Sequence, residues 1–180
     1  MKTFIFKSAA VCLLAFLSAC GNKKSPTELE PEPPMPTPGL AYPNFRLSEP
    51  DSTRMGYPGY TLSTDSGKVI VLNFFATWSG PCRAETPELK TKIWEKYKDR
   101  NVVVLGINLQ ESSDLVKQWK AQHGLTFRLL LDAKGEVAKA YQVGAIPHNV
   151  VIDKEFKVRF TQIGYGGNLN DLIARIESLL

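Results

Sequence analysis

Cysteine and histidine are scarce in this chain. Its 180 residues contain three cysteines and two histidines. Three cysteines are too few for a disulfide-built scaffold. Two histidines without paired cysteines give no credible metal site, so we expect neither a metal nor another cofactor. The formal charge of +4 is small and the lysines and arginines are scattered, which excludes nucleic acid as an expected partner.

Apolar runs long enough to cross a bilayer are also missing. Lys2 and Lys7 accompany an apolar run over Ser8–Ala19, well short of the ~20 residues that a spanning helix needs. This pattern is typical of a secretory signal peptide. The run ends in L-S-A-C, which resembles the lipobox of bacterial lipoproteins. The resemblance implies a lipoprotein signal peptide over residues 1–19 and a lipid on Cys20; an ordinary signal peptide with a chance cysteine is the alternative.

A proline-rich stretch follows the predicted signal peptide. Seven prolines fall between Gly21 and Pro43, and large apolar residues are few. Such a composition cannot build a core and favours a semi-extended spacer. We therefore expect a lipid-anchored linker over residues 20–43. It would hold a folded domain over residues 44–180 on a bacterial membrane, facing the periplasm or the cell exterior.

Strand and helix patterns alternate along the predicted domain. Apolar runs predict buried strands at Val69–Phe75 and Val102–Ile107, and Phe127–Leu131 is expected to be a third strand. Short extended pieces are expected at 44–47 and 60–62, and a hairpin is expected from 149–153 and 158–163. Helices are expected at 80–98, with a kink at Pro87, and at 112–123 and 136–141. A last helix should start near Asn168 and bury Leu169, Leu172, Ile173, Ile176 and Leu180. This alternation predicts a three-layer α/β/α sandwich with a mixed central sheet.

The junction between the first buried strand and its helix carries the candidate chemistry. It reads T-W-S-G-P-C over residues 77–82, and Cys82 is the one cysteine outside the first twenty residues. Free amides and the dipole at a helix N-terminus stabilise an anion, so a thiolate is favoured there. The alternative is that Cys82 is a small buried apolar residue.

These features resemble the thioredoxin superfamily, in particular the TlpA/ResA group of membrane-tethered thiol–disulfide oxidoreductases. The resemblance rests on the apolar strand, the W-x-G-P-C turn, Pro87, the G-A-I-P segment at 144–147, and the additional helix and strand over Ser112–Leu131. It implies the fold, partners that are extracytoplasmic protein thiols or disulfides, and a peptide groove with a cis-proline. The implied groove residues are Trp78, Gly80, Pro81, Ile146 and Pro147.

The sequence departs from the W-C-x-P-C motif of that group, because Ser79 stands at the first cysteine. Without a second thiol, the dithiol cycle is excluded, and redox chemistry would be limited to a monothiol reaction at Cys82. Ser79 either caps the helix of a site that has lost its catalytic activity or donates a hydrogen bond to a Cys82 thiolate. Glu85 is either the proton acceptor for Cys82 or a solvated first-turn carboxylate.

Two further functions compete with the monothiol oxidoreductase that we favour. Peroxiredoxins carry a T-x-x-C turn, which Ser79-x-x-Cys82 nearly matches, although Phe75 stands at their upstream proline. A non-catalytic module could instead bind a polypeptide in the groove beside Pro147. His148 follows that proline, and both titration near neutrality and a structural role are open to it.

Overall fold

A computed structural model of the chain describes residues 44–52 and 59–180. The predicted signal peptide, Cys20 and the linker lie outside the described residues. Within those two described ranges, no helix combines the length and apolar character that a membrane crossing requires.

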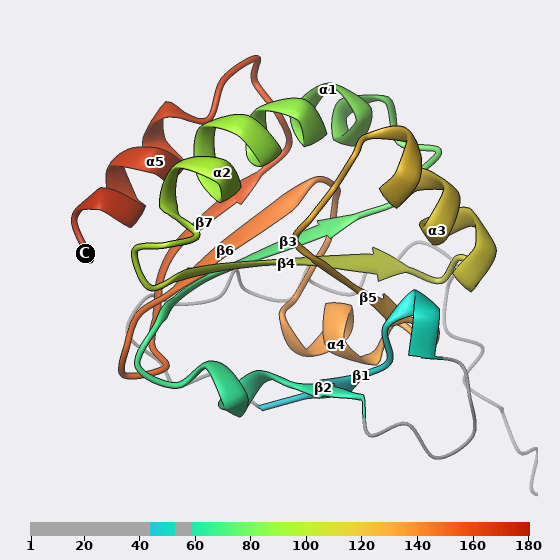
Figure 1. Cartoon of the computed structure of the whole chain (residues 1–180), viewed down its shortest axis with the longest axis horizontal. Helices are drawn as coiled ribbons and strands as arrows, with labels where there is room; N and C mark the ends of the chain where they lie inside the picture. Colours follow the sequence, from blue (N-terminus) through green and yellow to red (C-terminus); the bar gives the residue numbers. More distant parts are fainter. Residues whose placement is uncertain (1–43, 53–58) are drawn as a thin grey trace, which may run out of the picture. The chain divides into compact units, whose positions relative to one another are not determined.

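A five-stranded mixed sheet forms the centre of the domain (Figure 1). Its order is β5 (Arg128–Asp132), β4 (Val102–Leu109), β3 (Val69–Phe75), β6 (His148–Ile152) and β7 (Val158–Ile163). The pairs β3–β4 and β4–β5 are parallel, whereas β3–β6 and β6–β7 are antiparallel. All seven residues of β3 are buried, as expected for a central strand covered on both faces. The predicted mixed sheet is confirmed.

Alternate residues of β3 supply two hydrophobic cores, one on each face of the sheet. Val69, Val71 and Phe75 pack beneath α1 (Gly80–Glu88), α3 (Ser113–Gln122) and α5 (Asn170–Glu177). Ile70, Leu72 and Phe74 pack on the opposite face. That face is covered by α4 (Glu136–Ala140), the pair β1 (Arg46–Leu47) and β2 (Tyr60–Thr61), and the 3₁₀ turn Leu62–Asp65 (Figure 1). A further 3₁₀ turn spans Pro50–Ser52.

The helix expected over residues 80–98 changes its hydrogen-bonding pattern along its length. After α1 comes a π-helical segment, Leu89–Trp94, and then α2 (Glu95–Tyr97). Pro87 lies inside α1 and has no N–H to donate, which disturbs the regular ladder just before the π segment. Leu89, Ile93 and Tyr97 are buried as predicted, and Lys92 pairs with Glu88 at 2.6 Å.

The ends of two helices show how closely local signals fix boundaries. Ser112 caps α3, where its Oγ accepts the Leu115 N–H at 3.4 Å, and Gly124 follows the helix with a φ of +55°. The last helix, α5, begins at Asn170, two residues later than expected. The predicted burial of Leu180 is wrong: it lies beyond the end of α5 and is 37% exposed.

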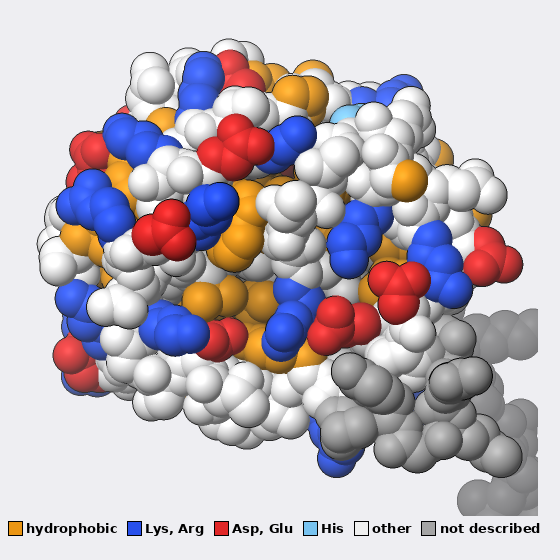
Figure 2. Space-filling view, viewed as in Figure 1, with side chains coloured by type: hydrophobic (Ala, Val, Ile, Leu, Met, Phe, Trp, Pro, Cys, Tyr) orange, Lys and Arg blue, Asp and Glu red, His pale blue; other side chains and the backbone are white. Residues whose placement is uncertain are grey.

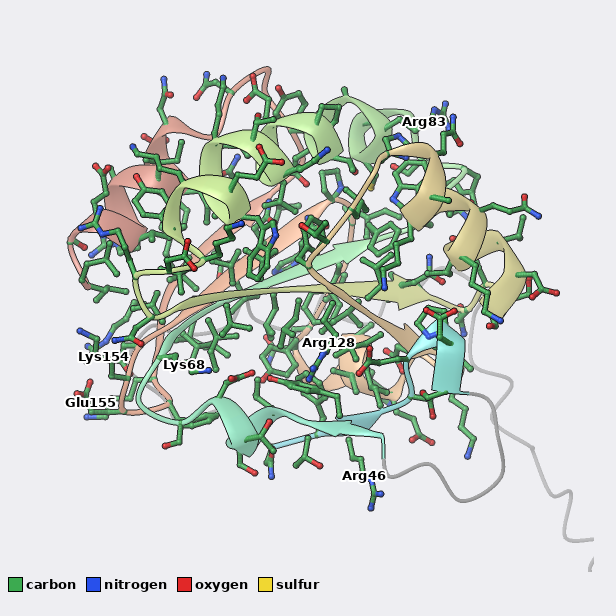
Figure 3. All side chains as sticks on the ribbon, in the orientation of Figure 1. Arg46, Lys68, Arg83, Arg128, Lys154 and Glu155 are labelled. Atoms are coloured by element: carbon green, nitrogen blue, oxygen red, sulfur yellow. The ribbon has the colours of Figure 1, made fainter. Side chains whose placement is uncertain are left out.

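Charges of both signs are mixed over the face shown in Figure 2, with apolar side chains visible between them. Arg128, labelled in Figure 3, illustrates the mixing: it pairs with Glu49 at 3.3 Å and lies 4.7 Å from the centre of the Tyr60 ring. Lysines and arginines on this face therefore have acidic neighbours and form no single-sign surface.

Candidate active site

Ser79 begins the helix that carries the cysteine. Its backbone is extended, and its Oγ accepts the backbone N–H of Cys82 at 3.4 Å. Pro81 occupies the first turn, where its missing N–H costs no hydrogen bond. The N-cap expected from the sequence is present. The turn is therefore fixed locally, by a side-chain cap and a proline that suits this position.

Cys82 is the third residue of α1 and its side chain is almost completely buried, at 1% exposure. Burial raises the pKa of the Cys82 thiol above its usual value, and a hydrogen bond from the Ser79 hydroxyl lowers it in part. Glu85 adds a smaller upward contribution to that pKa. The helix N-terminus alone favours a thiolate, but desolvation outweighs it in this conformation.

Glu85 lies one turn further along α1 and is buried, at 1% exposure. The expectation of a solvated first-turn carboxylate is therefore wrong. Its Oε2 accepts a hydrogen bond from Asn73 Nδ2 at 2.8 Å, and its Oε1 accepts one from Asn149 Nδ2 at 2.6 Å. Asn73 Nδ2 also donates to Asn149 Oδ1 at 2.8 Å. These two asparagines are register partners on β3 and β6.

The surroundings of Glu85 bring its titration close to neutrality. Burial raises the pKa of Glu85 to about 7, although the hydrogen bonds from Asn149 and Asn73 act in the opposite direction. A carboxyl group with this pKa can accept or release a proton at neutral pH. Asn73 and Asn149 were not predicted as site residues. The signal that could have found them is an amide side chain inside an otherwise apolar strand pattern.

A groove of about 770 Å³ lies beside the turn. Trp78, Ser79, Gly80 and Pro81 line it together with Ile146, which precedes the cis-proline. Trp78 is 70% exposed and offers a large apolar surface. Pro147 is buried and is not part of the lining. Its carbonyl accepts the Gly164 N–H at 2.7 Å.

Two charged residues brace the turn itself. Glu111 accepts hydrogen bonds from Thr77 N at 2.7 Å, from Thr77 Oγ1 at 2.6 Å and from Asn108 Nδ2 at 2.6 Å. Arg83, which lies at the start of α1 in Figure 3, donates from Nη1 to the Trp78 carbonyl at 2.7 Å. Sequence reasoning missed both residues, because their partners depend on how β4 and α1 meet the turn.

His148 does not titrate near neutrality. It is fully buried on the face opposite Glu85, where its ring lies 6.0 Å from that of Phe74. Neither ring nitrogen has a hydrogen-bond partner, and burial lowers the pKa of His148 to about 4. The ring is therefore neutral at pH 7 and has a structural role. Over residues 44–52 and 59–180, no cluster of three or more metal-binding side chains occurs.

The mixed sheet and the helix-capping turn opposite a cis-proline define a thioredoxin-like protein. Solved structures agree with this assignment. A Chlorobium tepidum structure named for the thiol:disulfide interchange protein DsbE matches with a TM-score of 0.71 and 27% identity, covering 80% of this chain and 98% of that one. A Bacteroides thetaiotaomicron structure named for a protein disulfide isomerase matches with a TM-score of 0.71 and 28% identity, covering 81% and 91%.

The chain belongs to the AhpC/TSA family, whose model matches residues 38–161. It is 32% identical to the thiol-disulfide oxidoreductase ResA of Bacillus thuringiensis subsp. konkukian over 120 residues, which are 67% of this chain and 66% of that protein. It is 35% identical to ResA of Geobacillus kaustophilus over 100 residues, which are 56% and 57% of the two chains. The chain thus spans about two thirds or less of the length of these relatives.

Proposed function

We propose that this chain is a thiol–disulfide oxidoreductase that uses a single thiol, Cys82, on a polypeptide bound in the groove. The observation that carries the proposal is the position of Cys82. It directly follows Ser79, Gly80 and Pro81, which line the groove, and is itself buried. Glu85, a buried carboxyl group, follows one helical turn away on the same side of α1. The names of the ResA relatives support the reaction class.

The reaction begins with proton transfer from the Cys82 thiol to the Glu85 carboxylate. The thiolate then attacks one sulfur of a partner disulfide, so that a bond to Cys82 Sγ forms, the partner S–S bond breaks, and the second partner sulfur leaves as a thiolate. A second thiol, from a protein or a small molecule, gives its proton to the thiolate released in the first step and attacks the partner sulfur of the mixed disulfide. A new disulfide forms between these two sulfurs, and the bond from the partner sulfur to Cys82 Sγ breaks. Cys82 leaves as a thiolate and regains its proton from Glu85.

A non-catalytic binding module is the second candidate. The burial of Cys82 and its raised thiol pKa favour this reading, because attack requires the buried thiol to become accessible. The same two properties count against a peroxidase, which needs an accessible thiolate. Binding in the groove would not depend on the state of the sulfur.

We further propose an extracytoplasmic location, with Cys20 carrying the lipid. The support is the sequence alone: a short apolar run, the L-S-A-C segment and the proline-rich spacer. In cells grown with a radioactive fatty acid, the chain should be labelled, whereas the variant Cys20→Ala should not. Label on Cys20→Ala, or none on the native chain, would contradict this location.

The reaction is tested with a peptide that carries an activated aromatic disulfide. The folded chain should release the aromatic thiol, and mass spectrometry should place the peptide on Cys82. The variant Cys82→Ala is the matched control for other thiols. If Cys82 is modified only in denaturant while Cys82→Ala still binds the unmodified peptide, the binding module is correct. The variant Ser79→Cys has two thiols in the turn, and it should reduce insulin disulfides if the rest of the fold supports dithiol chemistry.

A further inference from the structure

The groove beside Ser79 continues beyond the turn that carries Cys82. A second hollow of about 380 Å³ shares Leu109, Gln110, Val143 and Gly144 with it, so the two form one depression. Trp78 marks the near end. Lys134, in the turn before α4, and Lys139, within α4, line the far end. The depression therefore leads from the turn that holds the cysteine to a pair of lysines.

The charge along this depression is uneven. Its one lining carboxylate is Glu111, whose two oxygens already accept hydrogen bonds from Thr77 and Asn108. Lys134 is 3.9 Å from Glu136, a weak pair because both side chains are highly exposed. Lys139 is exposed and forms no ion pair with the part of the chain that the structure describes. The far end thus presents two lysines against one nearby carboxylate, that of Glu136, and has an excess of positive charge.

The walls between the two ends suit an extended chain. Leu109, Val143 and Ile146 supply apolar contacts along the depression. At Gly144 no atom lies within 4 Å of the position that a Cβ would take, so another backbone can approach closely there. An extended segment advances about 3.3 Å per residue, so the partner residue at the far end lies further along that segment than the one at Ser79.

We propose that the groove selects an extended polypeptide with acidic side chains further along the segment than the residue that lies at Ser79. Lys134 and Lys139 bind those acidic side chains, while Trp78 and the apolar walls hold the intervening segment. This inference rests on the proposed function, because the near end of the groove is the proposed substrate site. It adds a preference for acidic polypeptides, which the thiol–disulfide exchange at Cys82 does not itself require.

The test uses three peptides of one sequence, with serine at the position of the reactive cysteine so that no disulfide forms. Their far ends carry two glutamates, two glutamines or two lysines. Fluorescence anisotropy of labelled peptides measures Kd for the native chain, for Lys134→Gln/Lys139→Gln, and for Lys98→Gln. Lys98 follows α2 at the opposite end of the sheet from Ser79 and serves as the control.

The glutamate peptide should bind about three- to tenfold more tightly than the glutamine peptide, and the lysine peptide more weakly. The double variant should remove this preference, Lys98→Gln should keep it, and added salt should reduce it. Equal binding of all three peptides, or an unchanged preference in the double variant, would overturn the inference and leave the proposed function standing. No binding of any peptide would overturn both.

Discussion

At the start of α1, the Ser79 hydroxyl contacts two groups of Cys82. It accepts the backbone N–H, and it forms the hydrogen bond that lowers the pKa of the thiol. The capping role is encoded locally, because serine is a favoured N-cap. The second role depends on the burial of the sulfur, which makes any hydrogen bond to it more significant. These two roles can be separated by substitution.

We predict that Ser79→Ala lowers the free energy of unfolding by about 1 kcal/mol and raises the pKa of Cys82 further. Ser79→Gly should raise that pKa equally but cost only a few tenths of a kcal/mol, because glycine is tolerated at the N-cap. Urea unfolding measures the first effect, and the pH dependence of alkylation measures the second. An alkylation profile unchanged in both variants would show that the hydroxyl does not act on the thiol.

At the scale of elements, β4 lies between β3 and β5 and brings bulky side chains from both close together. Gly106 pairs with Asn73 on one side and Leu129 on the other. A Cβ at Gly106 would lie 2.5 Å from Leu129 Cδ2 and 3.3 Å from a Phe75 ring carbon. The strand therefore needs a residue without a side chain at its centre.

We predict that Gly106→Ala destabilises the chain by roughly 1–3 kcal/mol, because the added methyl group forces neighbouring side chains to move. Gly166→Ala is the matched control, since nothing lies within 4 Å of its added Cβ. The difference in urea midpoints of the two variants measures the effect. Equal midpoints would mean that Leu129 adjusts without cost.

The strand patterns were predicted well, and the long helix less so. The apolar run at 69–75 coincides with β3, because a fully buried strand must be apolar on both faces. The change to a π-helical segment at Leu89–Trp94 was not predicted. Pro87 indicated a disturbance, but the hydrogen-bonding pattern adopted after it depends on packing against the sheet.

On the scale of the whole molecule, two buried ionisable groups lie on opposite faces of the sheet and respond to pH in opposite ways. The pKa of Glu85 is raised from 4.5 to about 7, so its stabilising contribution is complete below pH 4.5 and is lost as pH rises through 7. The pKa of His148 is lowered from 6.5 to about 4, so its contribution is present above pH 6.5 and is lost as pH falls through 4.

We predict that these two effects oppose each other between pH 4.5 and 6.5. Together, the two groups should therefore change the free energy of unfolding of the native chain little over this pH range. In His148→Leu, stability should fall as pH rises toward 7, by roughly 3 kcal/mol from Glu85. In Glu85→Gln, stability should rise over the same range by a similar amount, which comes from His148. Urea unfolding across this pH range measures both slopes. Parallel slopes in the two variants would contradict the assignment.

The sequence by itself determined the strands and the N-caps at Ser79 and Ser112, because these depend on residues that are close together in the chain. It also determined the position of Cys82 and the missing second thiol, which are read directly from the residue types. Only the tertiary structure decided the state of the site. Asn73 and Asn149 are far apart in the chain, yet they meet across β3 and β6 to hold Glu85. Burial of Glu85 and Cys82 then sets their pKa values. Desolvation depends on every element packed around a group, and no local pattern contains that information.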